Sequence, residues 1–411
     1  MISNILRRFS LRMFDNTNVT TDTGLSVEMK TFYEKQLIRF AQPNLVHEQV
    51  CEKKPLPANK GKVIEFRYFD PLPKALAPLT EGVTPSGRKL SVNSLTAEVY
   101  QYGDYVEISD IASLTTIDPL LTETVTLQGQ QAGKTRDTII RNYLQAGTNV
   151  LYAPKISGGS EMEIVARYGL DADCKLTWDA IEKAVAIMKA NNVPTFEDGC
   201  YHAIVHPFVV YDLRRNADWL DAHKYADAMP LLNGEIGKIA GVRFLESSEA
   251  KVYSGADLAS DARNLNLSAN ASAATTISFN GGTVAQNALK DRYILIGTNY
   301  RKVVSNTANS ITVDSAVTAT SGTVIAPGEG GAGGIAVFGT LLCGKNSSAV
   351  TDLEGGGLQY FVEGFGSAGS ADPLHQRQTA GWKMTSCAEV LVQAYIMRIE
   401  SASKFTAVAE N

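Results

Sequence analysis

The stretch KVIEFRYFDPLPKALAPLTEGVTPSGRKLSVNSLTAEVYQYGDYVEIS, residues 62–109, constrains how the rest of the chain must be organised. Its first part alternates between two faces of a strand, with Val63, Glu65, Arg67 and Phe69 on one face and Ile64, Phe66 and Tyr68 on the other. A second strand-like run, residues 94–109, follows a segment rich in proline and glycine. We therefore expect a long two-stranded arm within residues 55–110. Because an isolated hairpin is only marginally stable in water, this arm must lie on its own chain or on a neighbouring one.

Two helices are predicted on either side of this arm. Residues 26–40 carry apolar side chains at helical spacing, and so do residues 118–146. The second helix has good end signals, because Asp118 suits the N-cap, Pro119 suits the first helical position and Gly147 can end the helix. Charged side chains along it exclude a bilayer, so we expect a long helix packed on a sheet.

The remainder of the chain changes character twice. Residues 175–250 alternate helix and strand, with helices beginning at Thr177 and Pro207, which indicates an α/β lobe. Residues 255–334 are rich in Ser, Thr, Asn, Ala and Gly, and short apolar runs alternate there with turns, which predicts an inserted all-β module with its own small core. Residues 384–401 alternate again and predict one long terminal strand. The fold class is therefore α+β.

Composition excludes several functional classes. The chain has 411 residues, enough for two or three lobes, with 38 basic and 43 acidic side chains and a net charge of −5. This balance argues against a protein that coats nucleic acid through a basic surface. No apolar run is long enough to span a bilayer, and residues 1–15 lack the apolar core of a secretory signal. Arg7 and Arg8 form a short basic cluster there, and Met13 is an alternative start.

The cysteines do not indicate a metal or disulfide framework. No two of the five are close in sequence and no C-x-x-C is present, so a reducing compartment is expected. The five are Cys51, Cys174, Cys200, Cys343 and Cys387.

One glycine-rich segment formally matches a dinucleotide fingerprint. Gly328, Gly330 and Gly333 give G-x-G-x-x-G, and Asp352 lies at about the right distance for a ribose contact. The fingerprint requires a strand before the glycines and a helix after them, whereas a β-branched run follows here. A hinge where the β-module rejoins its lobe is therefore favoured over a nucleotide site.

Other candidate chemistry is equally weak. His202 and His206 are four residues apart, but they lie in a strand-like segment without an acidic third ligand, which favours structural roles. Asp212, Arg214 and Arg215 form a charged turn that suits a solvated face or a subunit contact. The sequence has no P-loop, G-x-S-x-G, HExxH or EF-hand pattern. We assign no catalytic, cofactor-binding or metal-binding residues, no cofactor and no enzymatic activity.

The stretch GFGSAGSADPLHQRQTAGWK, residues 364–383, poses the choice between a phosphate cradle and a turn. It has neither a P-loop lysine nor a helix start after its glycines. We expect it to be a connector that crosses between two lobes, with Gly364, Gly366 and Gly369 supplying backbone freedom. Trp382 should then anchor the terminal strand by packing on the lobe beneath.

Four segments in this order resemble the major capsid proteins of tailed phages, which have the Hong Kong phage type of fold, and more narrowly the N-four-type major capsid family. They are TTDTGLSVEMKTFYEKQLIRFAQPNLV, KGKVIEFRYFDPLPKALAPLTEGVTP, VHPFVVYDLR and GFGSAGSADPLHQRQTAGWK. The resemblance covers nearly the whole chain, and its specificity lies in the order of the segments.

The resemblance implies a domain plan with an N-arm, an extended loop, a spine helix, and peripheral and axial domains. The expected limits are 1–54 for the N-terminal arm and helix, 55–110 for the extended loop, 111–174 for the spine helix and peripheral domain, 175–254 for the axial domain, 255–334 for the inserted β-module, 335–371 for the continued axial domain, and 372–411 for the return to the peripheral domain.

The resemblance also implies partners and location. Copies of the chain would form hexamers and pentamers that self-assemble into an icosahedral shell around double-stranded DNA, which the inner face holds without sequence readout. Portal and scaffolding or decoration proteins would be further partners, no membrane is involved, and assembly would take place in the host cytoplasm before the shell becomes part of the virion. Some relatives cross-link a Lys to an Asn, and Lys74 and Lys89 lie in the extended loop, but no pair can be identified.

Three alternatives stay open on the sequence alone. One is a bacterial nanocompartment shell of the same fold, which would differ in its cargo. The others belong to different classes: a glycan-binding protein that acts through the β-module, and a nucleotide-dependent enzyme that uses the glycines near residue 330.

Overall fold

The computed structural model describes residues 46–411 apart from 58, 70–71, 77, 80, 83, 85–86, 117–119, 158–159, 216–237, 366, 368–371 and 410. Four sequence expectations lie outside the described residues. They are the helix at 26–40, the Asp118 cap, the continuation of the Pro207 helix beyond residue 215, and the roles of Gly366 and Gly369.

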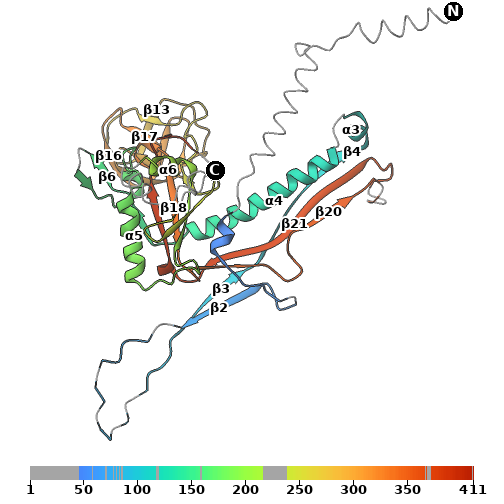
Figure 1. Cartoon of the computed structure of the whole chain (residues 1–411). Helices are drawn as coiled ribbons and strands as arrows, with labels where there is room; N and C mark the ends of the chain where they lie inside the picture. Colours follow the sequence, from blue (N-terminus) through green and yellow to red (C-terminus); the bar gives the residue numbers. More distant parts are fainter. Residues whose placement is uncertain are drawn as a thin grey trace, which may run out of the picture. The chain divides into compact units, whose positions relative to one another are not determined.

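A five-stranded sheet and the long helix that packs on it form the first lobe (Figure 1). The central strand β21 pairs with β19 near its C-terminal end, and with β20 and β4 on its two sides near its N-terminal end. Helix α4 runs along β21, as the spacing of apolar residues predicts. The elements are β1 (Glu52–Lys53), β19 (Ser348–Thr351), β21 (Arg377–Val390), β20 (Gln359–Glu363), β4 (Tyr100–Ser109) and α4 (Leu120–Gln145).

A seven-stranded sheet forms the second lobe. Its centre is β18, all of whose residues are buried. Thr177 caps α5 by accepting a hydrogen bond from the Ala180 amide, and Pro207 occupies the first turn of α6, so both predicted helix starts are confirmed. The strands are β5 (Val150–Tyr152), β22 (Ile396–Ser401), β18 (Val337–Cys343), β8 (Tyr201–Val205), β10 (Val242–Glu246), β9 (Lys238–Ile239) and β11 (Val252–Tyr253), and the helices are α5 (Trp178–Ala190) and α6 (Pro207–Leu213).

Six short strands close into a barrel with its own apolar core. The core side chains come from alternate positions, such as Ile294 and Ile296 or Ile311 and Val313, because successive residues of a strand face opposite sides. The strands are β12 (Leu265–Leu267), β13 (Ala271–Asn280), β14 (Tyr293–Ile296), β15 (Asn299–Asn306), β16 (Ser310–Ala319) and β17 (Val324–Pro327).

Within the described residues, the remaining elements are two ribbons and five short helices. Strands β2 (Val63–Phe69) and β3 (Val92–Glu98) form the first ribbon, and β6 (Lys155–Ser157) and β7 (Ser160–Met162) form the second. The helices are η1 (His47–Val50), α3 (Asp110–Thr115), η2 (Arg167–Gly169), η3 (Ala332–Gly334) and η5 (Gln393–Tyr395).

The expected two-stranded arm is shorter than predicted. Its second strand divides at Val99, where β3 ends and β4 begins, and β4 pairs with β21 rather than with β2. A ten-residue ladder with β21 satisfies more backbone groups than a longer free ribbon would. Gly103 permits this close pairing, because a Cβ there would lie 2.6 Å from the Trp382 carbonyl oxygen.

The predicted terminal strand over 384–401 is wrong as a single element. Val390 ends β21 in one sheet and Ile396 begins β22 in the other, with η5 between them. The Ser347 carbonyl accepts hydrogen bonds from the Leu391 and Val392 amides, which turns the chain at this point. The alternation of apolar residues continues through the break because both flanking strands are buried.

The predicted crossing between lobes over residues 364–379 is also wrong. Strands β20 and β21 are adjacent and antiparallel, so residues 364–376 connect two neighbours of one sheet. The chain leaves the seven-stranded sheet after Cys343 and returns to it at Ile396. The expected boundary at 371/372 therefore does not coincide with a change of sheet.

Candidate functional site

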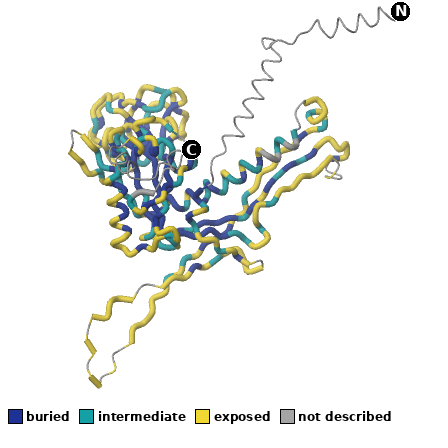
Figure 2. The backbone as a smooth tube through the Cα atoms, viewed as in Figure 1, coloured by how far each residue is buried: buried dark blue, intermediate teal, exposed yellow. Residues whose placement is uncertain are grey.

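The described residues of the loop at the end of the β2–β3 ribbon are exposed (Figure 2), and several of them have large apolar side chains. Leu76 and Leu79 are 83% and 79% exposed, and six further apolar residues of the ribbon and its loop are also exposed. These six are Val63, Tyr68, Phe69, Leu72, Leu90 and Val92. Large exposed apolar side chains gathered on one ribbon and its loop are typical of an interaction site.

The base of the same ribbon is anchored. Phe66 is only 7% exposed and packs with Ala97 against Leu56, Ala349 and Cys387 of the five-stranded sheet region. The alternation seen in the sequence explains this, since Ile64 and Phe66 share the face that meets the sheet. The ribbon is therefore held at one end and presents its other end to solvent.

A second apolar surface lies at the far end of the five-stranded sheet. Edge strand β20 exposes Tyr360, Phe361 and Val362, and β4 exposes Tyr105 and Val106. Edge strands present unpaired backbone groups as well as side chains, and proteins normally protect them. Both surfaces thus suit contact with another polypeptide.

The frame between these surfaces is fixed by polar contacts between α4 and its neighbours. Gln128 Nε2 donates to the Ala380 carbonyl oxygen at 2.8 Å. Arg136 bridges Glu48 Oε2 at 2.8 Å and Asp352 Oδ2 at 2.7 Å. Burial acts to raise the pKa of Glu48, but Lys53 and Arg136 outweigh it and hold that pKa below its usual value. The helix, the sheet and η1 are therefore joined by charge-assisted bonds.

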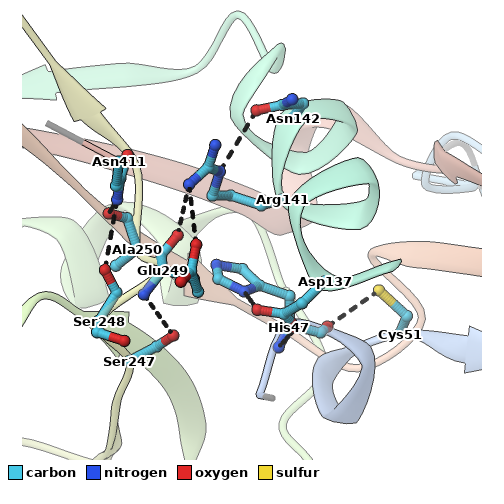
Figure 3. A network of polar contacts seen from close by, with 10 residues as sticks. All are labelled: His47, Cys51, Asp137, Arg141, Asn142, Ser247, Ser248, Glu249, Ala250 and Asn411. Atoms are coloured by element: carbon cyan, nitrogen blue, oxygen red, sulfur yellow. Dashed lines mark hydrogen bonds and ion pairs between the residues drawn. The ribbon is translucent and has the colours of Figure 1, made fainter. Parts of the chain in front are cut away.

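A buried pair ties η1 to the middle of α4 (Figure 3). His47 Nδ1 lies 2.7 Å from Asp137 Oδ2, and the His47 amide donates to Asp137 Oδ1 at 3.0 Å. One turn further along α4, Arg141 donates to the Glu249 carbonyl oxygen at 2.9 Å, and burial lowers the pKa of its guanidinium. The side chain of Asn411 donates to backbone carbonyls of the same 247–250 loop.

A fully buried carboxylate of β22, that of Glu400, joins η2 to the seven-stranded sheet. Glu400 accepts two hydrogen bonds of 2.6 Å from Arg167 and one of 2.8 Å from Arg398. The Arg167 guanidinium lies 3.6 Å from the centre of the Tyr253 ring. Arg398 also donates to the Gly147 carbonyl oxygen at 3.0 Å, which satisfies a carbonyl just beyond the helix end.

The barrel is attached to neighbouring segments of the chain by hydrogen bonds and one ring contact. Arg263 donates to the Gly334 carbonyl oxygen at 2.7 Å, and Arg292 donates to the Ala256 carbonyl oxygen at 2.6 Å. The ring of Tyr300 stacks on Tyr168 of η2, with centroids 6.0 Å apart. These contacts hold the barrel against the segments before β12 and after β17 and against η2.

The glycines near residue 330 pack closely against backbone. A Cβ at Gly330 would lie 2.4 Å from the Ile335 carbonyl oxygen, and a Cβ at Gly331 would lie 2.4 Å from that of Leu170. Asp352, which the fingerprint would place on a ribose, is paired with Arg136 instead. The segment joins β17 to β18, as the hinge interpretation predicts, but it is tightly packed.

The two histidines have separate structural roles. His202 stacks on Phe196 with centroids 4.0 Å apart and lies 3.1 Å from Asp198, whereas His206 Nδ1 accepts a 3.2 Å hydrogen bond from the Phe208 amide at the start of α6. Within the described part of the chain, no three His, Cys, Asp or Glu side chains converge as a metal site would require.

The charged turn and the cysteines also have structural surroundings. Asp212 accepts 2.8 Å hydrogen bonds from Ser403 Oγ and the Lys404 amide, so it ties down the C-terminal segment instead of facing solvent. All five cysteines are free thiols. Burial raises the pKa of Cys51 to about 12 and that of Cys387 to about 11, which makes both poor nucleophiles.

Sequence reasoning missed the buried ionic contacts. Asp137 and Glu400 look like ordinary charges of a helix and a strand, and their partners are 90 and 233 residues away. The one available signal was the position of Glu400 within the apolar run IMRIES, where a charge requires a partner if the strand is buried. No helix in the described residues combines the length and hydropathy needed to cross a membrane.

Comparison with known proteins gives consistent results. A family model described as phage capsid protein matches residues 122–364, more than half of the chain. The capsid of cyanophage P-SCSP1u is similar at 13% identity and a TM-score of 0.52, covering 86% of this chain and 87% of that one. Capsids of Ralstonia phage GP4 (13%, 0.52, covering 88% and 89%) and cyanophage Pam1 (14%, 0.51, covering 90% and 93%) are similar too. No curated protein matches the sequence.

Proposed function

The chain belongs to the phage capsid protein family and is a major capsid shell protein of the tailed-phage type, and on this premise we propose how its copies are joined. The apolar tip of the β2–β3 ribbon contacts the next copy, and repetition of this contact forms hexamers and pentamers of a closed icosahedral shell.

The observation that carries this proposal is the contrast within the ribbon. Its base is packed on the chain's own sheet, whereas Leu76 and Leu79 are bare. Removing each of these two side chains from water would contribute roughly 1.5–3 kcal/mol. A shell repeats that contribution at every subunit, so a modest contact suffices to hold many copies.

We also propose a domain assignment that follows the sheets. The five-stranded sheet with α4 corresponds to the peripheral domain with its spine helix, and the seven-stranded sheet with α5 and α6 corresponds to the axial domain. The β2–β3 ribbon corresponds to the extended loop, and the barrel corresponds to an insertion in the axial domain.

The role we assign is structural, without a catalytic step. Packaged double-stranded DNA, a portal, and scaffolding or decoration proteins are the proposed partners, and assembly is proposed to take place in the host cytoplasm. The net charge of −5 supports an inner surface that surrounds DNA without adhering to it.

A double variant tests the ribbon contact. Leu76→Asp/Leu79→Asp should leave the subunit folded, with an unchanged melting temperature, but should abolish shells in negative-stain images and light scattering. The control Thr84→Asp/Ser91→Asp adds the same charge to the same loop without removing apolar area, and it should assemble. If the leucine variant assembles as well as the control, the ribbon is not the contact. Purified wild-type shells that contain a protein cargo and no nuclease-resistant DNA would instead indicate a nanocompartment.

A further inference from the structure

The axial lobe carries a cavity of about 550 Å³ on one side. Its walls come from edge strand β5, from β7 and the segment after it, and from α5. Val165 lines it while being 83% exposed, and Ile187 of α5 is exposed beside it. The cavity is therefore a hollow open to solvent, with exposed apolar side chains in its lining.

The rim of this cavity is acidic. Glu161, Glu163 and Asp179 line it together with one cation, Lys183, which gives a net charge of −2. None of the four has an ion-pair partner within 4 Å among the described residues. Strand β5 is also the end strand of its sheet in the described chain, paired with β22 alone. A partner for this hollow should combine cationic and apolar groups.

The same lobe presents a surface of that chemistry elsewhere, on α6 and the C-terminal segment. Phe405 is 55% exposed, stacks on Phe208 at 4.5 Å, and meets the exposed Tyr211 edge to face at 5.3 Å. The Arg215 guanidinium lies 4.5 Å from the centre of the Tyr211 ring, and Lys404 is exposed beside Phe405. We refer to these residues as the aromatic–basic patch.

The two surfaces are complementary and come from different elements of one chain. An acidic apolar hollow and a basic aromatic patch attract each other, but neither attracts its own kind. A contact between unlike surfaces of identical subunits is head-to-tail, and such contacts close into rings when the rotation permits. Exposed aromatic and arginine side chains are also the types enriched in the centres of interfaces.

We propose that the aromatic–basic patch of one copy docks into the β5–α5 cavity of the next copy around each capsomer. This inference rests on the proposed shell function and names the second contact of the ring, independent of the β2–β3 ribbon. Its occupant is a second copy of this chain, since that copy carries the matching charge and apolar side chains.

Charge reversal of each surface tests the pairing. Glu161→Lys/Glu163→Lys and Arg215→Glu/Lys404→Glu should each lower the assembled fraction by about tenfold at low salt, because like charges now face each other across the contact. The variant that combines all four substitutions restores opposite charges and should recover most of the assembly. Glu197→Lys/Glu354→Lys, which adds the same charge at exposed sites outside the cavity, should assemble like the wild type.

Mixing the two reversed variants gives a sharper result. Each variant assembles poorly alone, but each cavity of one variant matches the patch of the other, so subunits must alternate around a ring. Alternation is possible in six-membered rings and impossible in five-membered ones. The mixture should therefore give hexamers or sheets in mass photometry and electron microscopy, without closed shells.

The outcomes separate the two proposals. If the wild type never assembles, the shell function fails. If the wild type assembles and either reversed variant does so equally well, or the fourfold variant does not recover, the docking proposal is overturned and another partner occupies the cavity. Melting curves of unassembled protein identify a misfolded variant. In that case Glu163→Gln replaces the charge reversal. This variant should weaken assembly at low salt, and its difference from the wild type should shrink as added salt screens the charge.

Discussion

His206 shows how one buried side chain makes subunit stability depend on pH. Its Nδ1 accepts the Phe208 amide hydrogen bond at the start of α6, and its ring packs 4.9 Å from Phe338. Burial lowers the pKa of His206 to about 4, so the folded protein keeps the ring neutral. A neutral nitrogen is what the N-cap of α6 needs, because a protonated one cannot accept the hydrogen bond.

The consequence for stability has a definite sign. Between pH 6.5 and pH 4 the unfolded chain binds a proton at His206 and the folded chain does not, so the free energy of unfolding should fall as pH falls, by at most about 3 kcal/mol. His206→Asn keeps an acceptor at the N-cap and should remove this part of the slope in urea titrations. Identical slopes for the two proteins over that window would contradict the assignment.

Glu400 shows a different case, a buried carboxylate that pairs with two arginines. Glu400→Gln retains the shape but leaves Arg167 and Arg398 without their counter-charge, which should cost about 3–5 kcal/mol in the free energy of unfolding. Glu389→Gln is the matched control, since Glu389 has no ion-pair partner in the described chain and burial raises the pKa of its carboxyl. It should lose about 1 kcal/mol or less, and equal losses for both variants would refute the special role of Glu400.

At the scale of elements, the β2–β3 ribbon depends on one aromatic anchor. Phe66→Ala removes the side chain that packs against Leu56 and Ala97, and large-to-small changes of this kind cost about 3–5 kcal/mol. Because the ribbon is attached by this small cluster, the loss should be local. Hydrogen exchange of amides 63–69 and 92–98 should accelerate strongly, while amides of α4 stay protected. Uniform acceleration across the chain would show that the ribbon is part of the main cooperative unit.

The sequence predicts elements well where one physical signal acts alone. Thr177 and Pro207 mark helix starts that the structure confirms, and the composition change near residue 255 precedes the barrel strands. The sequence predicts elements poorly where two neighbouring strands are both buried and share one alternation of apolar residues. Val390 and Ile396 continue one alternation, yet they belong to two sheets, because periodicity reports that each residue is buried without reporting what it is buried against.

Of the two candidate contact surfaces, the sequence anticipates the β2–β3 ribbon but not the β5–α5 cavity. The need of the hairpin arm for a packing surface follows from the sequence, because an isolated hairpin is only marginally stable in water. The β5–α5 cavity does not, since it joins residues of three separate elements. Pairings of that kind depend on the topology of the sheet and leave no local pattern.

At the scale of the whole molecule, the barrel should be removable. Its core is contributed by residues 258–325, and its contacts with the main lobe are few enough to name. Replacing residues 257–328 with a short Gly/Ser linker should preserve the circular dichroism of the helices and the hydrogen-exchange protection of α4. Unfolding of α4 or α5 in this variant would show that the barrel is part of the main core.

The apolar cluster between the two sheets has a mechanical consequence for a closed shell. Ile140 of α4, Leu341 of β18 and Val350 of β19 pack in one cluster, so neither sheet can tilt against the other without opening a void. In the proposed shell, five-membered and six-membered rings would demand different bending between subunits. The rigid pair of sheets would pass that strain to the β2–β3 ribbon and to the contacts between copies. The length and stiffness of the ribbon, rather than the packing of the two sheets, would then set the radius of curvature of the particle.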